Sequence, residues 1–122
     1  MSRGAMPGGR LTTHVLDTAE GRPAAGLTLT LTRLDGQDRR VLGRFHTNAD
    51  GRCDAPLLAG DALRPGLYEI LFQVGDWRAA HGAPGIGFYD DIPIRFRIAD
   101  PHGHYHVPLI LSPFGYSTYR GS

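Results

Sequence analysis

Two histidines near the end of the chain, His104 and His106, are the residues whose spacing first indicates chemistry. Side chains two residues apart in a β-strand lie on one face, so the pair points the same way if this segment is a strand. A His-x-His pair on a strand is a frequent arrangement of metal ligands, and a neutral imidazole is also a suitable general base for water. The ordinary alternative is two polar residues on an exposed strand face.

A third histidine, His14, lies in the first patterned segment and shares a strand face with Thr12 and Leu16. A histidine in a strand is more often a hydrogen-bonded structural residue than a catalytic one. Only the fold could bring His14 to the other two, either as a third zinc ligand or as a second acid–base group. No Glu or Cys stands at a spacing that would complete a zinc site.

The other polar candidates carry weaker signals. Arg52 follows a turn and Arg120 lies two residues before the end of the sequence, positions where arginine is normally solvated. Tyr119 can pack on the core or make a hydrogen bond to a ligand. Ser117 and Ser122 suggest a serine nucleophile beside a histidine, but the chain has no Gly-x-Ser-x-Gly elbow to hold one.

The last segment, residues 112–122, is unusual for a terminus. Terminal residues are commonly polar and poorly ordered. This segment instead contains Phe114, Tyr116 and Tyr119, has no trailing run of charges, and follows the apolar residues 107–111. We expect the tail to be fixed in place and to line a site.

Short segments with period-two patterning must position all of these residues. Between Gly- and Pro-containing turns, the alternation predicts strands at 11–16, 27–32, 40–47, 66–74, 94–98 and 104–111. Residues 48–51, Asn-Ala-Asp-Gly, are a strong turn signal because Asn, Asp and Gly tolerate positive φ. One short helix is predicted at 76–82, from the N-cap candidate Asp76 to Gly82. Seven or eight short strands predict an all-β fold, an antiparallel β-sandwich.

The composition indicates one ordinary globular domain. Of 122 residues, 41% are hydrophobic and 20% charged, and 13 basic against 12 acidic residues give a net charge of +1. No long basic run indicates nucleic-acid binding, and no apolar run approaches the ~20 residues of a membrane helix. We expect residues 1–10, which lack the apolar core of a secretory signal, to be a flexible arm, and 11–122 to be the domain. Cys53, the single cysteine, permits no internal disulfide and suits the cytoplasm, where we expect the protein.

Three stretches of the chain carry a resemblance to a known family. They are residues 11–24 (LTTHVLDTAEGRPA), residues 47–52 (TNADGR), and residues 104–109 (HYHVPL) leading into 116–122 (YSTYRGS). Together they resemble the 5-hydroxyisourate hydrolase branch of the transthyretin-like family, over about residues 11–122. The closing Tyr-Arg-Gly-Ser is the motif that marks the hydrolases against the hormone-carrying transthyretins.

The resemblance implies a sandwich of two four-stranded sheets with one short helix, assembled as a homotetramer with sites at the dimer–dimer interface. It implies hydrolysis of 5-hydroxyisourate to 2-oxo-4-hydroxy-4-carboxy-5-ureidoimidazoline in urate degradation, with no metal and no organic cofactor. The family's catalytic positions fall on His14, Arg52, His106 and Ser122. Its substrate-binding positions fall on His14, Arg52, Tyr119 and His104.

Two other functions remain open at this point. A transthyretin-like carrier would bind an aromatic small molecule in an interface channel, although a hormone carrier needs an apolar channel and histidines are polar. A metal-binding module would use His14, His104 and His106. In the hydrolase, the planar cation of Arg52 would bind an anionic, urate-like ring or stabilise the oxyanion that forms when water attacks the ring carbonyl. The sequence leaves open whether His14 or His106 is the base.

Overall fold

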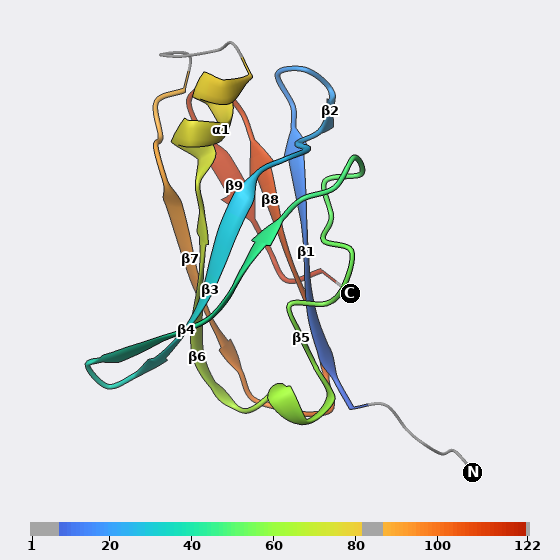
Figure 1. Cartoon of the computed structure of the whole chain (residues 1–122), viewed down its shortest axis with the longest axis vertical. Helices are drawn as coiled ribbons and strands as arrows, with labels where there is room; N and C mark the ends of the chain where they lie inside the picture. The colour runs from blue at the N-terminus through green and yellow to red at the C-terminus, as the bar shows by residue number, and fades with distance from the viewer. Residues whose placement is uncertain (1–7, 82–86, 122) are drawn as a thin grey trace.

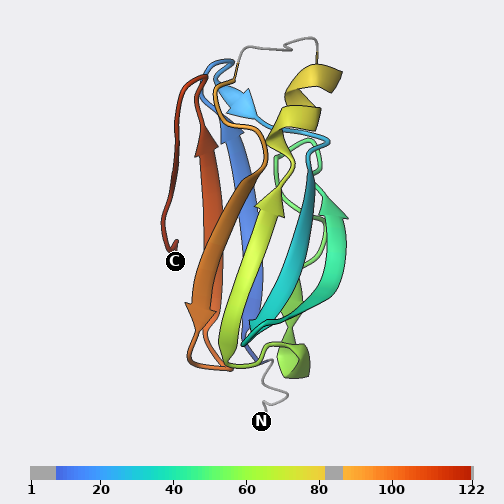
Figure 2. The same ribbon diagram turned by 90° about the vertical axis from the view of Figure 1, so that its left-hand side faces the viewer.

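The computed structural model describes residues 8–81 and 87–121, which form two β-sheets packed face to face (Figure 1; Figure 2). Its elements are, in chain order, β1 (Arg10–Asp17), β2 (Arg22–Pro23), β3 (Thr28–Asp35), β4 (Asp38–His46), β5 (Leu58–Ala59), the 3-10 turn η1 (Gly60–Ala62), β6 (Gly66–Phe72), α1 (Val74–Ala80), β7 (Ile92–Ile98), β8 (His104–Leu111) and β9 (Tyr116–Thr118). The predicted all-β sandwich with one short α-helix is confirmed.

The two sheets differ in how their strands pair. One has the order β4-β3-β6-β7 and is antiparallel throughout; the other has the order β2-β1-β8-β9, and the two-residue strand β5 adds to β1 as a fifth strand. β1 and β8 pair in parallel, from Arg10 opposite His104 to Asp17 opposite Leu111, so the expectation of antiparallel pairing is wrong at this pair. Parallel neighbours need a long crossover, which the intervening strands of the sandwich supply.

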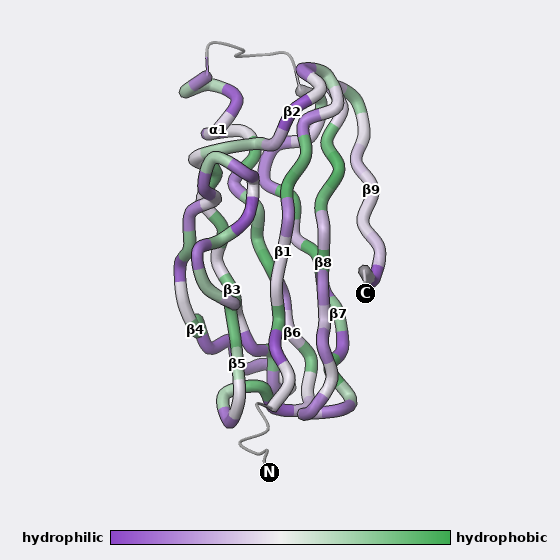
Figure 3. The backbone as a smooth tube through the Cα atoms, turned by 90° about the vertical axis from the view of Figure 1, so that its right-hand side faces the viewer, coloured by the Kyte–Doolittle hydropathy of each residue, from purple (hydrophilic) through white to green (hydrophobic). Residues whose placement is uncertain are grey.

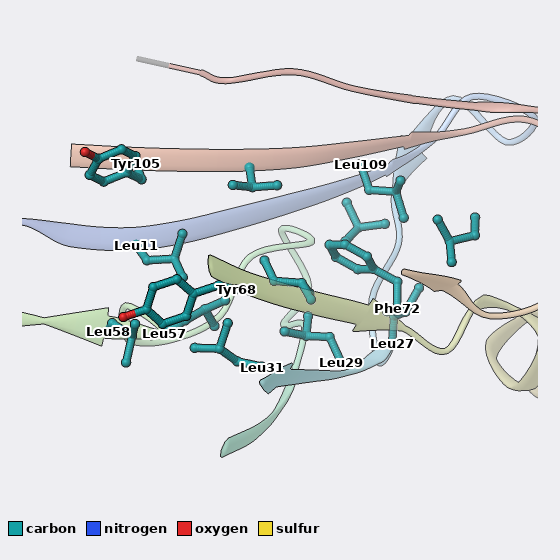
Figure 4. Packing of buried hydrophobic residues seen from close by; sticks show 14 of the residues in the cluster. Leu11, Leu27, Leu29, Leu31, Leu57, Leu58, Tyr68, Phe72, Tyr105 and Leu109 are labelled. Atoms are coloured by element: carbon teal, nitrogen blue, oxygen red, sulfur yellow. The ribbon is translucent and has the colours of Figure 1, made fainter. Parts of the chain in front are cut away.

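The period-two patterns place the hydrophobic core between the sheets. Leu11 and Val15 of β1 are fully buried, as are Leu29 and Leu31 of β3, and these side chains meet Phe72 and other residues of β6 in the interior (Figure 4). Each such side chain contributes about 1.5–3 kcal/mol when it is fully buried. A one-residue slip of β1 would expose its leucine and valine and bury the histidine between them, so the core fixes which face His14 occupies.

The helix begins two residues earlier than the sequence predicts. α1 spans Val74–Ala80 rather than 76–82, because Gln73 is the residue that precedes its first turn and Asp76 lies within that turn. A carboxylate in the first turn interacts favourably with the positive end of the helix dipole, which is a different use of Asp76 from capping. Gly82 lies outside the described residues. No helix among the described residues has the length and apolar character that crossing a membrane requires.

The first strand also begins earlier than predicted. The backbone N–H groups of Gly9 and Arg10 donate to the carbonyls of Pro101 and Gly103, at 3.2 and 3.1 Å. Gly9 can approach this segment because it has no side chain; a Cβ there would collide with the Gly103 backbone. The expectation that residues 1–10 form a flexible arm is therefore wrong for Gly9 and Arg10. Residues 1–7 lie outside the described part of the chain.

Candidate active site

The outward face of the β2-β1-β8-β9 sheet carries the three candidate histidines. The parallel register places Thr12 opposite His106, His14 opposite Pro108, and Arg10 opposite His104. Figure 3 shows β1 lying beside β8, with the C-terminal tail on the far side of β8. His14 and His106, 92 residues apart in sequence, thus come from adjacent strands and lie one row apart on one face, at a strand spacing of about 4.8 Å.

A tight turn brings Arg52 to the same face. Gly51 has a φ of 76°, in the left-handed region that favours glycine, and a Cβ at this position would lie only 3.3 Å from Cδ2 of His14. The turn pairs directly with β1: the Val15 N–H donates to the Gly51 carbonyl at 2.8 Å, and Arg52 forms an antiparallel bridge with His14. The predicted turn is confirmed, and its function in the fold is to place Arg52 next to His14.

Asn48 holds this turn closed. Its side-chain oxygen accepts the backbone N–H groups of Asp50 and Arg52, at 2.9 and 3.2 Å, and its side-chain amide donates to Asp54 at 3.0 Å. An asparagine that bonds its own backbone two residues ahead is a common way to build such a turn. The position of the Arg52 backbone therefore depends on one amide side chain that the sequence marks only as a turn former.

His14 is locked by the same turn. Its Nε2–H donates to the carbonyl of Asp50 at 3.0 Å, and because a carbonyl only accepts, the neutral ring carries its proton on Nε2. Partial burial and the positive charge of Arg52 lower the pKa of His14 below 6.5, against the opposing effects of the Asp50 carbonyl and carboxylate. His14 is therefore neutral at neutral pH, and its Nδ1 has no hydrogen-bond partner within residues 8–81 and 87–121.

His106 is held from both sides. Its Nδ1 lies 2.8 Å from the hydroxyl of Thr12, and its opposite ring edge faces Gly121, where a Cβ would come within 2.6 Å of Cδ2. Burial, then the charge of Arg52, then His14 lower the pKa of His106 below 6.5. This ring is also neutral at neutral pH. Thr12 contacts its Nδ1 and Gly121 lies against its Cδ2, so Nε2 is the ring nitrogen that neither neighbour contacts.

A cavity of about 440 Å³ opens beside His106. It lies between the first halves of β1 and β8 and the segment that follows the turn, and its lining is Arg10, Thr12, Thr13, Arg52, Cys53, Asp54, Ala55, Pro56, His104, Tyr105 and His106. Of the predicted site residues, the structure thus gathers Arg52, His104 and His106 around one space. His14 is not part of the lining, and it reaches the site through its bridge to Arg52.

Arg10 is a cavity residue that the sequence does not reveal. It is the first residue of β1 and falls within the expected flexible arm, and only its register opposite His104 places it at the cavity. None of the three ion pairs among the described residues includes Arg10 or Arg52. Two guanidinium groups that form no ion pair with a carboxylate of the described residues make this space suitable for an anion.

Cys53 also lines the cavity, and it is half-buried as expected. Burial and the neighbouring Asp54 carboxylate raise the pKa of its thiol. Because the thiolate is the nucleophilic form, this environment makes Cys53 a poor nucleophile at neutral pH.

The C-terminal tail is fixed along the edge of β8. β9 pairs with Leu109–Leu111, the Thr118 hydroxyl donates to the Pro108 carbonyl at 2.7 Å, and the Gly121 N–H donates to the His106 carbonyl at 2.7 Å. The Arg120 guanidinium lies over the ring of Tyr105, 4.5 Å from its centroid. The prediction of an ordered tail is confirmed for residues 116–121. Gly121 of the tail lies against the Cδ2 edge of the His106 ring.

Two predicted site residues are not brought to the cavity. Tyr119 is 58% exposed and lines a separate hollow of about 210 Å³ between the tail and β7, although the β8–β9 register places it opposite Pro108. Ser122 lies outside the described residues. Their assignment to the site therefore stays a prediction.

The three histidines do not converge on a point. His104 is four residues along β8 from Pro108, the residue opposite His14, which is roughly 13 Å at the rise of a strand. Within residues 8–81 and 87–121, no three His, Cys, Asp or Glu side chains gather in a way that could hold a metal ion. The hypothesis of a three-histidine metal site therefore gains no support from the geometry.

Comparison with known proteins identifies the family of this chain. The model of the HIUase/Transthyretin family matches residues 11–121. The chain belongs to this family. It is 60% identical over 117 residues to the 5-hydroxyisourate hydrolase of Mesorhizobium japonicum, covering 94% of each chain.

Solved structures of proteins similar to this member of the HIUase/Transthyretin family have the same fold. The 5-hydroxyisourate hydrolase of Klebsiella pneumoniae is 36% identical with a TM-score of 0.80, and the match covers 93% of this chain and 99% of that one. An (S)-allantoin synthase is 45% identical with a TM-score of 0.87; the match covers 93% of this chain but only 44% of the synthase, so this chain spans less than half of that protein.

Proposed function

We propose that this protein hydrolyses 5-hydroxyisourate to 2-oxo-4-hydroxy-4-carboxy-5-ureidoimidazoline. The observation that carries the proposal is a cavity with Arg52 and His106 in its lining, beside a second histidine whose pKa is also lowered. Neutral imidazoles can accept a proton from water, and guanidinium groups can hold an anionic ring. The 60% identity to a curated 5-hydroxyisourate hydrolase supports the choice of substrate.

In the proposed reaction, His106 is the general base. A water proton moves to Nε2 of His106 while the water oxygen bonds to the carbonyl carbon of the ring. Arg52 stabilises the oxyanion that forms. Collapse of this intermediate breaks the ring C–N bond as the nitrogen takes the proton back from Nε2 of His106, which returns the imidazole to its neutral form. His106 is assigned the base because it lines the cavity, whereas Nε2 of His14 is committed to the Asp50 carbonyl.

His14 then has a supporting role in this proposal. It lies against Arg52, and a neutral ring there adds no positive charge that would compete with the guanidinium for the oxyanion. We further propose that His104 and Tyr119 contact the substrate and that Ser122 assists proton transfer, as the family resemblance implies. No metal or organic cofactor takes part in these steps.

We also propose that the active form is a homotetramer with sites at the dimer–dimer interface. The cavity lies on an outward sheet face, so a second subunit would be needed to cover it. The edge near the tail carries exposed aromatic rings, with Phe88, Phe114 and Tyr119 at 73%, 78% and 58% exposure. Exposed apolar rings beside a free strand edge are typical of an interface. Light scattering after gel filtration should give about four times the 13.3 kDa of one chain.

The deciding experiment follows freshly prepared 5-hydroxyisourate by ultraviolet absorbance, with and without the protein. We expect decay to accelerate in proportion to protein concentration, to be unchanged by a chelator, and to be abolished by heating the protein. Decay equal to that in buffer would remove the hydrolase assignment and leave the carrier of an aromatic small molecule. The carrier is disfavoured because Arg10, Arg52, His104 and His106 make the cavity polar.

A further inference from the structure

A threonine that the reaction scheme does not use lies within hydrogen-bond distance of the His106 ring. Thr12 lies directly opposite His106 in the parallel register, and its hydroxyl oxygen is 2.8 Å from Nδ1. No other hydrogen bond of this hydroxyl is found among the described residues. The contact therefore has one evident purpose, which is to hold the imidazole.

We propose that Thr12 is a positioning residue that accepts the Nδ1–H of His106, and thereby keeps Nε2 unprotonated and turned toward the cavity. This inference rests on the proposed hydrolase function for its kinetic part only, because the protonation of the ring can be measured without substrate.

The direction of the hydrogen bond follows from what the base must do. A neutral imidazole carries one proton, so Nε2 is free to accept a proton only when Nδ1 carries it. A threonine oxygen can accept that Nδ1–H in the neutral state and again in the imidazolium, where the bond becomes charge-assisted and stronger. If the hydroxyl donated to Nδ1 instead, the neutral ring would carry its proton on Nε2 and could not accept one from water there.

The opposite edge of the ring makes this orientation specific. Cδ2 faces Gly121, where even a methyl group would lie at 2.6 Å, and the Gly121 N–H donates to the His106 carbonyl at 2.7 Å. The ring therefore fits between a hydroxyl on β1 and a bare backbone in the tail. In histidines generally, a hydrogen bond at one ring nitrogen determines which of the two nitrogens carries the proton.

The titration of His106 is set by several other charged groups as well. Arg52 and His14 lower its pKa directly, together with burial. The other titratable or charged residues around the cavity and the described tail are Arg10, Cys53, Asp54, His104, Tyr105, Tyr119 and Arg120. All of these stay in place when only Thr12 is changed, so a change in the titration of His106 reports the lost hydroxyl.

The test compares Thr12→Val, which keeps the shape and removes the hydroxyl, with Thr12→Ser, which keeps the hydroxyl. The chain also offers a matched control: Thr28 and His46 form the same contact, hydroxyl to Nδ1 at 3.0 Å, on the other sheet. Thr28→Val removes an equivalent hydrogen bond away from the cavity, so it reports the cost of losing such a pair without touching His106.

The first measurement is nitrogen-15 NMR of labelled protein at pH 8 without substrate. We expect His106 to carry its proton on Nδ1 in the wild type and in Thr12→Ser, and to populate both tautomers in Thr12→Val. A proton on Nε2 in the wild type would overturn the proposal, and so would an unchanged tautomer in Thr12→Val. If Thr12→Val does not fold, the wild-type tautomer and the Thr12→Ser comparison still decide the matter.

The second measurement is the pH dependence of kcat. We expect Thr12→Val to lower kcat roughly tenfold, the scale of one hydrogen bond to a charged group, and to change KM much less. The imidazolium loses its acceptor, so the acid limb should move to lower pH by up to about one unit. Thr12→Ser should restore both quantities, and Thr28→Val should change neither. Equal kinetics in Thr12→Val and wild type would overturn the role, whereas no activity in any form would overturn the hydrolase function and leave the NMR result standing.

Discussion

The outward faces of the two sheets carry the same kinds of residues in different settings. Each has a threonine hydroxyl on the Nδ1 of a histidine, Thr12 with His106 on one sheet and Thr28 with His46 on the other. Each also has arginines nearby. On the β4-β3-β6-β7 face, however, the carboxylate of Glu69 accepts bonds from two of them, Arg39 at 2.7 Å and Arg95 at 3.0 Å.

On the β2-β1-β8-β9 face the described residues supply no such ion pair to Arg52. Burial lowers the pKa of both histidines on this face, and the charge of Arg52 lowers it further. Residue types alone therefore do not distinguish a site from a stabilising surface. The difference among the described residues is whether the arginine is paired with a carboxylate, as on the β4-β3-β6-β7 face, or forms no ion pair and lies beside groups that titrate.

The sharpest way to break this comparison is to remove each histidine in turn. We expect His106→Asn to reduce kcat about 10² to 10⁴-fold, the usual contribution of a general acid–base group. His46→Asn removes the matched ring on the other sheet and should leave kcat within about twofold. Both are measured by ultraviolet decay of 5-hydroxyisourate, with gel filtration as the check on assembly. Equal losses in the two variants would show that the faces do not differ in function.

Removing the charge of Arg52 tests whether electrostatics distinguishes the two faces. We expect Arg52→Gln to lose about 10² to 10³-fold in kcat, the scale for one oxyanion donor. The positive charge lowers the pKa of His14 and His106, so its removal lets both rise toward 6.5. The residual activity should then begin to fall at higher pH than in the wild type, since only the neutral ring is a base.

The matched control is Arg39→Gln on the other face, where the arginine is already paired with Glu69. It should change neither kcat nor the position of the acid limb. A pH profile for Arg52→Gln that coincides with the wild-type profile would show that the charge of Arg52 does not contribute to the lowered pKa of the two histidines.

The sequence predicts much of this arrangement because strand faces follow from a period of two. The strand at 104–111 is found with the predicted ends, and His14 lies on the face predicted for it, since Leu11 and Val15 must be buried. Two-residue strands such as β2 and β5 have no periodicity to detect. The parallel pairing of β1 with β8 joins segments more than 90 residues apart and is a property of the whole sandwich.

For the site, the sequence identifies reactive residue types and misses those whose role depends on register. Thr12 matters only because it falls opposite His106, and Arg10 only because it falls opposite His104. Gly121 belongs to the closing motif, but the structure is needed to explain why it is glycine: a Cβ there would collide with the ring of His106. Such residues are ordinary in type, so no local pattern marks them.

The tail glycine offers a smaller and more selective perturbation. Gly121→Ala would place a Cβ within 2.6 Å of the His106 ring and should shift the ring from its position. Displacements of about 1 Å in a catalytic group can cost up to about 10²-fold, and we expect a loss of about tenfold or more in kcat. Gly115→Ala is the control in the same tail, because the nearest atom to its Cβ would be the Ser112 hydroxyl at 3.5 Å. Full activity in Gly121→Ala would mean that the tail does not hold the ring.

The smallest effect on activity should come from breaking the ion pairs of Glu69 with Arg39 and Arg95 on the β4-β3-β6-β7 face. Glu69 is 5% exposed; burial alone would raise its pKa, but the hydrogen bonds and charges of Arg95 and Arg39 hold the pKa below 4.5. Its ionised form therefore stabilises the fold above the pKa of an unfolded glutamate, and this stabilisation is lost as pH falls through the lowered folded-state value. We expect Glu69→Gln to cost about 1.5–3 kcal/mol in unfolding free energy at pH 7, less at pH 3, with kcat unchanged. Thermal unfolding at both pH values and the ultraviolet assay check this, and a large loss of kcat at full stability would show that the two faces are coupled rather than separate.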